Sequence, residues 1–229
     1  MKKRLVIIPA FNEAGNIVRT VEDIRNNAPS FDYIVINDHS FDQTEEILKE
    51  RGYNYVSLPI NSGIGVAVQT GYLYAVQMGY ESIIQVDGDG QHDAHFLEEM
   101  ADELEKGSAD MIIGSRFLKK EGFQSTGLRR VGIRFFTRLI RMLTGQTVTD
   151  PTSGMRIVNA RIAALFAEEY PKDYPEPETA VVVLRHGWKI REIPVRMKPR
   201  ESGTSSISFK RSVYYMVKVP LACIMAALA

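Results

Sequence analysis

Short apolar runs and amphipathic stretches alternate along the first half of the chain. An apolar run bounded by turn residues is typical of a buried strand, whereas apolar positions three and four apart indicate one face of a helix. The runs predicted to be strands are residues 5–8, 33–37, 55–58, 82–86 and 111–113. Strands that alternate with helices predict a mostly parallel sheet with helices on its faces, which is an α/β fold.

Two of the helices between these strands are marked by their ends as well as by their spacing. The apolar positions of residues 17–24 recur at helical spacing before Pro29, which stops a helix. Residues 96–104 show the same spacing between Asp93, a candidate cap, and Gly107, a candidate stop.

The pattern becomes less regular beyond Gly114. We expect a basic loop, a helix from about 127 to 143, a turn-rich stretch over 147–154, helices around 161–169 and 178–186, and a strand over 189–197. Pro194 cannot donate a hydrogen bond to a neighbouring strand, so this strand is predicted at the edge of the sheet. The Ser- and Gly-rich stretch 199–208 is a candidate lid.

The last apolar stretch, residues 213–229, is interrupted by Lys218 and Pro220. A helix that spans a bilayer needs about 20 apolar residues. We therefore expect this segment to lie on a membrane surface, to pack on the body of the protein, or to join two copies of the chain.

The charges of the chain balance but are unevenly placed. Lys plus Arg and Asp plus Glu each total 28, which argues against nucleic acid as a partner. Basic residues gather over 116–141 and 185–211, and this predicts anionic ligands for the second half. Cys223 is the single cysteine and no apolar signal segment precedes the first strand, so we expect a cytoplasmic location.

Polar residues follow four of the predicted strands directly. In open parallel sheets, ligands bind beyond the carboxyl ends of the strands. The segments at these positions are residues 9–13, Asp38, residues 61–65 and residues 87–92. Asp38 could accept hydrogen bonds from ribose hydroxyls or from a base N–H, which would also suit a dinucleotide. A dinucleotide site needs a glycine fingerprint after the first strand, and residues 9–13 contain none.

The fourth of these segments, Asp-Gly-Asp-Gly-Gln-His, carries the strongest chemical signal. Asp87 and Asp89 would repel each other unless a cation lay between them and the substrate. Mg²⁺ or Mn²⁺ suits such oxygen ligands, and Asp89 with the Gln91 carbonyl is the predicted pair. Asp87 would then face sugar or ribose hydroxyls. The alternative is a surface turn rich in Asp and Gly, but the position after a buried strand favours the metal.

The predicted helix over 127–143 combines basic and apolar positions. Arg130, Arg134, Arg138 and Arg141 recur at steps of three and four residues, beside a predicted apolar face formed by Val131, Phe135, Leu139 and Met142. Such a helix can lie on anionic lipid. A solvated basic face on a buried helix explains the same spacing.

Several segments in this order resemble one family of enzymes over nearly the whole chain. They are VIIPAFNEAGNI, INDHSFDQT, NSGIGVAVQTG, VDGDGQH, GSRF and DPTSGMR. The chain resembles the family-2 glycosyltransferases of the GT-A fold, and within them the dolichyl-phosphate mannose synthase and polyprenyl-phosphate glycosyltransferase branch. The resemblance implies transfer of a sugar from a nucleotide diphosphate with inversion at the anomeric carbon.

The resemblance also implies roles for single residues. Residues expected to hold the nucleotide-sugar are Pro9, Phe11, Glu13, Asp38, Gly63 and Asp87, and those expected to bind the metal are Asp89 and Gln91. Arg116 would approach the acceptor phosphate, and we expect Arg129, Arg130 and Arg200 near it. Asp150 would be the base if the acceptor is a hydroxyl, or else caps the turn before Pro151. Glu176 and Glu178 would shape the acceptor or sugar pocket, whereas His92 and His186 are interpreted as structural.

We therefore expect one domain over residues 1–229, with a nucleotide-sugar half (1–114), an acceptor half (115–208) and an apolar C-terminal helix (209–229). The predicted reaction moves a hexose to a polyprenyl phosphate. A lipid phosphate is already an anion and needs no base, but arginines must screen it from the donor phosphates. Transfer to a sugar hydroxyl of a glycan, and a non-catalytic nucleotide-sugar or membrane adaptor, are the alternatives.

A sugar nucleotidyltransferase would open with a glycine-rich loop followed by basic residues, which residues 9–13 are not. Many members of the resembled branch carry spanning helices after the catalytic domain. Lipid acceptance would here depend on the basic helix and the apolar segment 213–229, or on a small membrane-protein partner. We expect a peripheral position on the inner face of the plasma membrane, and a homo-oligomer stays open.

Overall fold

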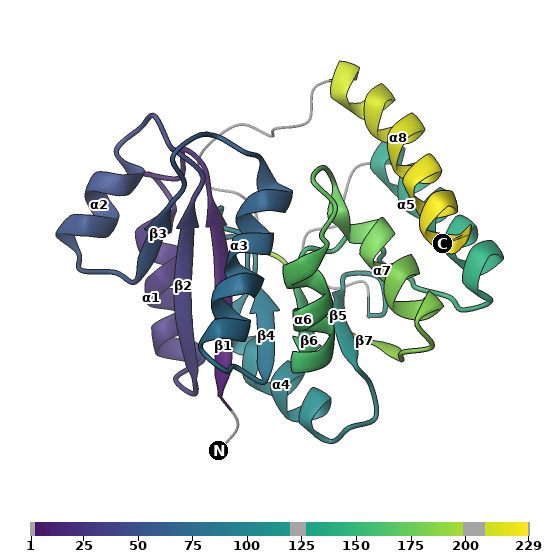
Figure 1. Cartoon of the computed structure of the whole chain (residues 1–229), viewed down its shortest axis with the longest axis horizontal. Helices are drawn as coiled ribbons and strands as arrows, with labels where there is room; N and C mark the ends of the chain where they lie inside the picture. The colour runs from purple at the N-terminus through teal and green to yellow at the C-terminus, as the bar shows by residue number, and fades with distance from the viewer. Residues whose placement is uncertain (1–2, 120–126, 199–208, 229) are drawn as a thin grey trace.

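The computed structural model describes residues 3–119, 127–198 and 209–228 (Figure 1). Its strands are β1 Arg4–Ala10, β2 Phe31–Asn37, β3 Tyr55–Ser57, β4 Ser82–Gln85, β5 Met111–Ser115, β6 Arg156–Asn159 and β7 Ile190–Pro194. Its helices are α1 Ile17–Asn27, α2 Thr44–Glu50, α3 Ile64–Gln77, η1 Ala94–Phe96, α4 Leu97–Glu105, α5 Gly127–Thr144, α6 Ala160–Glu168, α7 Pro175–Arg185 and α8 Phe209–Leu228. The candidate lid over 199–208 lies outside the described residues.

Within the described residues the strands form one seven-stranded sheet in the order β3-β2-β1-β4-β6-β5-β7. The pairs β1 with β2, β1 with β4, β2 with β3, and β5 with β7 are parallel. β6 is antiparallel to both β4 and β5, so β4 and β5 point the same way. The carboxyl ends of all the strands except β6 therefore lie along one edge of the sheet.

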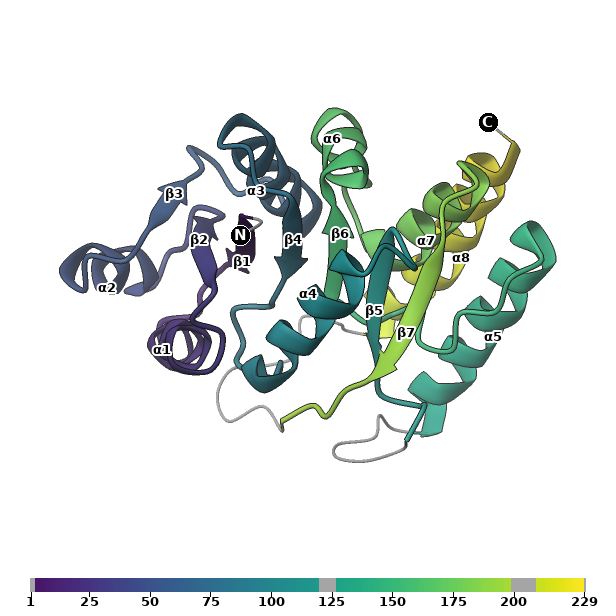
Figure 2. The same ribbon diagram turned by 90° about the horizontal axis from the view of Figure 1, so that it is seen from below.

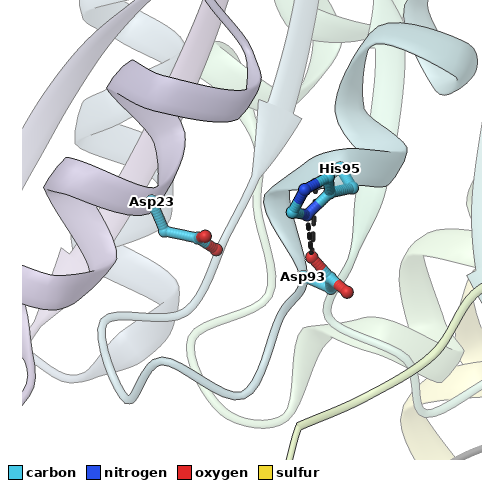
Figure 3. A group of neighbouring side chains, drawn as sticks. All are labelled: Asp23, Asp93 and His95. Atoms are coloured by element: carbon cyan, nitrogen blue, oxygen red, sulfur yellow. Dashed lines mark hydrogen bonds and ion pairs between the residues drawn. The ribbon is translucent and has the colours of Figure 1, made fainter.

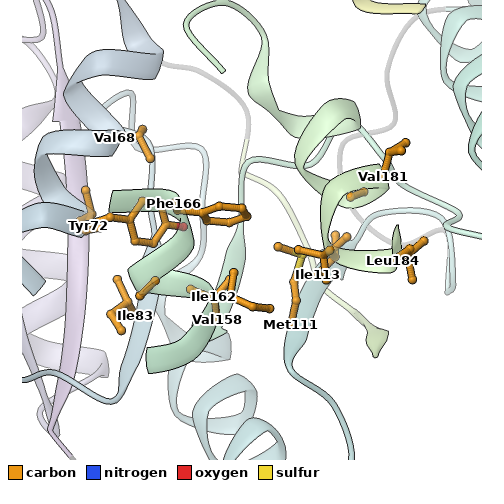
Figure 4. Packing of buried hydrophobic residues seen from close by; sticks show 14 of the residues in the cluster. Val68, Tyr72, Ile83, Met111, Ile113, Val158, Ile162, Phe166, Val181 and Leu184 are labelled. Atoms are coloured by element: carbon orange, nitrogen blue, oxygen red, sulfur yellow. The ribbon is translucent and has the colours of Figure 1, made fainter. Parts of the chain in front are cut away.

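Alternate side chains of the central strands enter two different cores. Val6 and Ile8 of β1 lie in a core with α1, α2 and α4, whereas Leu5 and Ile7 lie in a core with α3, α6 and α7. Figure 2 shows α1 and α4 on one side of the sheet and α3 and α6 on the other. In the second core Tyr72 meets Phe166 edge-on at 5.3 Å between ring centroids (Figure 4). Burial on both faces explains why the strands are continuous apolar runs.

The predicted mostly parallel α/β sheet is confirmed, with β7 at its edge as expected from Pro194. The sequence analysis missed β6. Its four residues, Arg-Ile-Val-Asn, contain two apolar positions, and α6 begins at the next residue. A strand this short has no periodicity to recognise, and it forms because β4 and β5 offer hydrogen bonds on both of its sides.

Arg130, Arg134, Arg138 and Arg141 of α5 are exposed, and of the apolar face predicted beside them only Leu139 belongs to the buried side of the helix. The buried side chains are Ile133, Phe136, Leu139 and Ile140, which pack toward α7 and α8. Val131, Phe135 and Met142 remain exposed, at 62%, 41% and 75%. The buried stripe is rotated around the helix from the predicted apolar face, because α7 and α8 pack on that side. The exposed apolar side chains therefore share the outer surface with the arginines.

Helix α8 packs on the body through Val219, Cys223 and Ala227, which are spaced by one helical turn and are buried. Its other face exposes Met225 and Leu228, at 71% and 81%. Among the residues that the structure describes, no helix combines the length and the apolar character that crossing a bilayer requires. In Figure 1, α5 and α8 lie side by side at one end of the molecule.

Candidate active site

Three loops meet at the carboxyl ends of β1, β2 and β4. The Asp38 N–H donates to the Ala10 carbonyl at 2.9 Å, and the Gly88 N–H donates to the Pro9 carbonyl at 3.3 Å. Pro9 is itself buried in β1 and contributes through this carbonyl. The loop after β1 also binds the start of α2, because the Glu13 N–H donates to the Thr44 hydroxyl at 2.9 Å. The sheet therefore brings three predicted site segments together.

The loop after β1 presents an exposed aromatic pair. Phe11 is 42% exposed and meets the ring of Phe41 edge-on, with 5.9 Å between centroids. Asn12 has φ of 55°, and it links the loops by donating from its N–H to Ser40 and accepting from the Phe41 N–H. Glu13 accepts a hydrogen bond from the Asn16 amide at 2.7 Å. Phe41 was not predicted as a site residue, and only its position after β2 could have indicated it.

Asp38 is buried and holds the loop that leads into α3. Its two carboxylate oxygens accept hydrogen bonds from the backbone N–H groups of Ser62 and Gly63, at 2.7 and 2.8 Å. Gly63 has φ of 89°, which suits glycine. The predicted nucleoside contacts Asp38 and Gly63 thus lie together, and in this structure the carboxylate organises the loop backbone.

The loop after β4 curls back on itself. The Gln91 N–H donates to Asp89 Oδ1 at 3.0 Å, and the Thr20 hydroxyl of α1 donates to the Gly88 carbonyl at 3.1 Å. Gly90 takes φ of 71° at the bend. The Asp87 carboxylate accepts a hydrogen bond from the Gln85 amide at 3.0 Å. Both aspartates and Gln91 therefore lie on one compact turn at the edge of the sheet.

This turn fits a divalent cation by the chemistry of its donors. Carboxylate and carbonyl oxygens on a short loop are the ligands that Mg²⁺ and Mn²⁺ prefer when substrate phosphates complete the shell. Asp89 is only 7% exposed. Residues 87–91 carry no basic side chain, and the guanidinium of Arg19 in α1 lies next to Gly90 of this loop.

A second cluster of possible metal ligands lies beside this loop, formed by Asp23, Asp93 and His95 (Figure 3). Its ligand atoms lie within 4.8 Å of one another. Lys198 already supplies a positive charge there, with its ammonium 2.9 Å from Asp23 and 3.4 Å from Asp93. His95 Nδ1 lies 2.8 Å from Asp93. Since a lysine neutralises this cluster, the loop with Asp89 and Gln91 is the better candidate for a metal.

Asp150 and Arg116 form a buried ion pair. The guanidinium donates from Nε and Nη2 to the two carboxylate oxygens, each at 2.6 Å, and Asp150 has no exposed surface. Glu192 of β7 accepts hydrogen bonds from the backbone N–H groups of Thr149 and Asp150, at 2.7 and 2.8 Å. Burial raises the pKa of the Glu192 carboxyl, and these hydrogen bonds oppose the shift. Asp150 and Arg116, two of the three predicted catalytic residues beside Asp89, are thus tied to a network that shapes the turn after α5.

Arg156 is a buried residue to which the sequence analysis gave no role. Its guanidinium donates to the carbonyls of Ser153, Pro151 and Glu176 and to the Thr179 hydroxyl. Burial lowers the pKa of this guanidinium. These bonds fix the turn before β6 against α7 and place Gly154 next to Asp87: a Cβ on Gly154 would lie 3.0 Å from Asp87 Oδ2. Nothing in the local sequence distinguishes such an arginine from a surface one.

Three arginines of α5 line one hollow of about 360 Å³. The residues around it are Phe117, Arg130, Ile133, Arg134, Thr137, Arg138 and Thr149. Phe117 and Thr149 adjoin the Arg116–Asp150 pair, at the end of β5 that shares the sheet edge with Asp87. The predicted acceptor residue Arg130 is therefore joined by Arg134 and Arg138. Arg200 and the Arg129 side chain lie outside what the structure describes.

A larger hollow of about 660 Å³ lies between α6, α7 and α8. Leu165, Val182 and Met225 are among its apolar walls, and Glu178 and His186 are among its polar ones. Burial raises the pKa of the Glu178 carboxyl. The structure thus separates Glu178, which lines this hollow, from Glu176, whose carbonyl binds Arg156.

The seven-stranded, mostly parallel sheet flanked by helices has the GT-A fold, as predicted. Residues 5–166 match glycosyl transferase family 2, and the chain belongs to this family. The family predicted from the sequence motifs is confirmed.

Two curated relatives and one solved structure are similar over most of the chain. The undecaprenyl-phosphate mannosyltransferase of Micrococcus luteus is 28% identical over 213 residues, which are 89% of this chain and 87% of that protein. The UDP-N-acetylglucosamine–dolichyl-phosphate N-acetylglucosaminyltransferase of Methanococcus voltae is 27% identical over 215 residues, 83% of this chain and 84% of that protein. The solved structure is that of glucosyl-3-phosphoglycerate synthase from Mycobacterium tuberculosis in complex with Mn²⁺, UDP and glucosyl-3-phosphoglycerate. It matches this chain with a TM-score of 0.73 at 17% sequence identity, and the match covers 99% of this chain and 80% of that chain. This last likeness concerns the fold.

Proposed function

We propose that this glycosyltransferase moves a hexose, with inversion at the anomeric carbon, from a nucleotide diphosphate sugar to a polyprenyl phosphate. The observation that carries the proposal is the hollow lined by Arg130, Arg134 and Arg138, at the same edge of the sheet as the Asp87–His92 loop. A cluster of arginines suits an acceptor that is itself an anion. The two relatives named for undecaprenyl and dolichyl phosphate support this class of acceptor.

We assign the donor to the loops after β1, β2 and β4. Phe11 and Phe41 offer exposed aromatic surface for a nucleoside, and Asp87 offers a carboxylate to sugar or ribose hydroxyls. Asp89 and the Gln91 carbonyl would hold Mg²⁺ or Mn²⁺ against the diphosphate. When bound, the cation stabilises the charge that gathers on the leaving diphosphate. The Mn²⁺ and UDP bound by the synthase of the same fold support this assignment.

The acceptor anion attacks without a base, since a phosphate oxygen carries its own negative charge. The task of the protein is to bring two anionic groups together, and the arginines of the hollow reduce their repulsion. Transfer to a sugar hydroxyl would need Asp150 as a base. Both oxygens of Asp150 are bound to Arg116 in a site without solvent access, which disfavours that alternative. Arg116, whose Nε and Nη2 bind Asp150, stays the predicted contact of the acceptor phosphate.

Arg130→Ala is expected to raise KM for undecaprenyl phosphate about tenfold to a hundredfold, because a charged hydrogen bond contributes about 1.5–3 kcal/mol. The dissociation constant for the nucleotide-sugar should change less than about twofold. Arg141→Ala is the matched control, as Arg141 is an exposed arginine of α5 outside the lining of the hollow. Sugar transfer to extracted lipid and donor calorimetry give the two constants. Equal losses for donor and acceptor would contradict the proposal.

The same proposal places the chain on the inner face of the plasma membrane, in the cytoplasm. Helices α5 and α8 contain no acidic residue, and their outer surface mixes arginines with exposed Phe135, Met142, Met225 and Leu228. A mixed basic and apolar surface matches an anionic bilayer, in which the acceptor would be dissolved. A small membrane-protein partner and a homo-oligomer remain predictions from the sequence.

Met142→Ser is expected to weaken binding to phosphatidylglycerol vesicles about tenfold, since burying a methionine side chain contributes about 1.5–3 kcal/mol. Met78→Ser is the control, because Met78 is 50% exposed at the end of α3, far along the chain from α5 and α8. Co-sedimentation at low salt measures both. If the two variants bind vesicles equally well, the α5 and α8 surface does not meet the membrane.

A further inference from the structure

His92 makes a hydrogen bond that fixes where its proton lies. The Asp87 N–H donates to His92 Nδ1 at 3.1 Å. A backbone N–H can only donate, so Nδ1 must be the acceptor and the proton of the neutral ring sits on Nε2. The ring is also held in place through its backbone, because His92 forms a β-bridge with Met197 and the Lys198 N–H donates to the Gln91 carbonyl at 2.8 Å.

The Nε2–H of this ring is buried and has no hydrogen-bond partner among the described residues. The His92 side chain is 1% exposed, so water does not reach the donor. Its Nε2 lies 3.7 Å from Asp87 Oδ2, which is longer than a hydrogen bond. A buried donor without an acceptor is disfavoured, so a conformation in which it is satisfied should lie close by.

Asp87 is the group that can move. Its side chain is 38% exposed, in contrast to the buried imidazole. Oδ1 accepts from the Gln85 amide at 3.0 Å, and the neighbouring Gly154 has no Cβ, which would otherwise lie 3.0 Å from Oδ2. Shortening the gap from 3.7 Å to about 2.9 Å would form a charge-assisted hydrogen bond.

We propose that His92 is a positioning residue for the donor: its Nε2–H binds the Asp87 carboxylate and orients it toward the hydroxyl that the carboxylate recognises. The inference rests on the proposed function, since Asp87 is assigned to the nucleotide-sugar there. It goes beyond the interpretation of His92 as structural. The two ring nitrogens then have different tasks: Nδ1 accepts the hydrogen bond from the Asp87 N–H, and Nε2–H orients the Asp87 carboxylate.

Two amide substitutions separate these tasks. Asn carries its carbonyl oxygen near the place of Nδ1, whereas Gln carries its amide nitrogen near the place of Nε2. His92→Asn therefore keeps the loop contact and removes the donor to Asp87, and His92→Gln does the opposite. Calorimetry in the presence of Mn²⁺ measures the binding of UDP-N-acetylglucosamine and of GDP-mannose. The constants kcat and KM are measured for the donor that the enzyme uses.

We expect His92→Asn to lower donor affinity and kcat/KM for the donor about tenfold or more, while KM for the acceptor stays constant. His92→Gln should recover most of that loss. In an Asp87→Asn background, His92→Asn should cause little further loss of donor affinity, because the two residues act as a unit. The inference would be overturned if His92→Asn bound the donor as tightly as the wild type, or if His92→Gln lost at least as much donor affinity as His92→Asn. The ring would then have its loop contact alone.

Calorimetry of donor binding distinguishes a failure of this inference from a failure of the proposed function. If the wild-type protein binds a nucleotide-sugar but transfers nothing to polyprenyl phosphate, the acceptor assignment fails, and the order of the two His92 variants in donor binding still decides the role of the ring. Thermal unfolding of both variants is recorded beside it. Equal destabilisation with equal loss of binding would show that ring packing is responsible and would also contradict the inference.

Discussion

Asp150→Ala is expected to lower the free energy of unfolding by about 3–5 kcal/mol, because it leaves a buried arginine without its counter-charge. Arg116 is 6% exposed, and both of its guanidinium hydrogen bonds to Asp150 are 2.6 Å long. The turn that carries Asp150 should loosen as well, since its backbone hydrogen bonds to Glu192 depend on the same geometry. Urea unfolding, with the slope m compared between variants, measures the loss.

The matched control replaces both members of the pair, as Arg116→Met with Asp150→Leu. Removing both charges takes away the desolvation cost together with the attraction, so this double variant should be more stable than Asp150→Ala alone. A loss below about 1 kcal/mol for Asp150→Ala would mean that Arg116 finds another partner or water.

Asp89→Asn is expected to lower the rate of sugar transfer about a thousandfold with little change in stability. The reason is that a metal clamp on a leaving diphosphate contributes several kcal/mol to the transition state, and each 1.36 kcal/mol is a factor of ten. The rate is followed against Mn²⁺ concentration, so that weaker metal binding can be told from slower chemistry.

Asp23→Asn provides the control for this experiment. Asp23 belongs to the neighbouring cluster with Asp93 and His95, where Lys198 already balances the charge. Burial alone would lower the pKa of the Lys198 ammonium, but its bonds to Asp23 and Asp93 raise that pKa. The positive charge of Lys198 therefore stays in place. We expect Asp23→Asn to leave the Mn²⁺ dependence as it is. The reverse result, with Asp23→Asn sensitive and Asp89→Asn tolerant, would move the metal to the cluster.

The first half of the fold follows from the sequence because β1, β2, β4 and β5 are buried on both faces. Runs such as Leu-Val-Ile-Ile and Tyr-Ile-Val-Ile need no partner to be recognised, and the loops after them lie at the sheet edge by topology alone. The loop with Asp87 and Asp89 was found in this way. β6 was missed because its stability comes from β4 and β5, which are distant in sequence.

The parts of the site that the sequence could not supply are those made by contacts across the chain. Arg156 is buried because Pro151, Glu176 and Thr179 surround it, and the charge of Arg116 is balanced by a residue 34 positions away. The buried face of α5 depends on which of its sides α7 and α8 approach. Charge and spacing predicted that α5 is basic and amphipathic, but the packing partner selects the buried stripe.

The reversed strand limits how the polypeptide can be divided. β6 comes from the predicted acceptor half yet is inserted between β4 and β5 of the predicted nucleotide-sugar half, so a fragment that ends at Gly114 would lack the strand that joins β5 to β4. The two parts are interlocked in one sheet, and the proposed donor and acceptor subsites share that sheet.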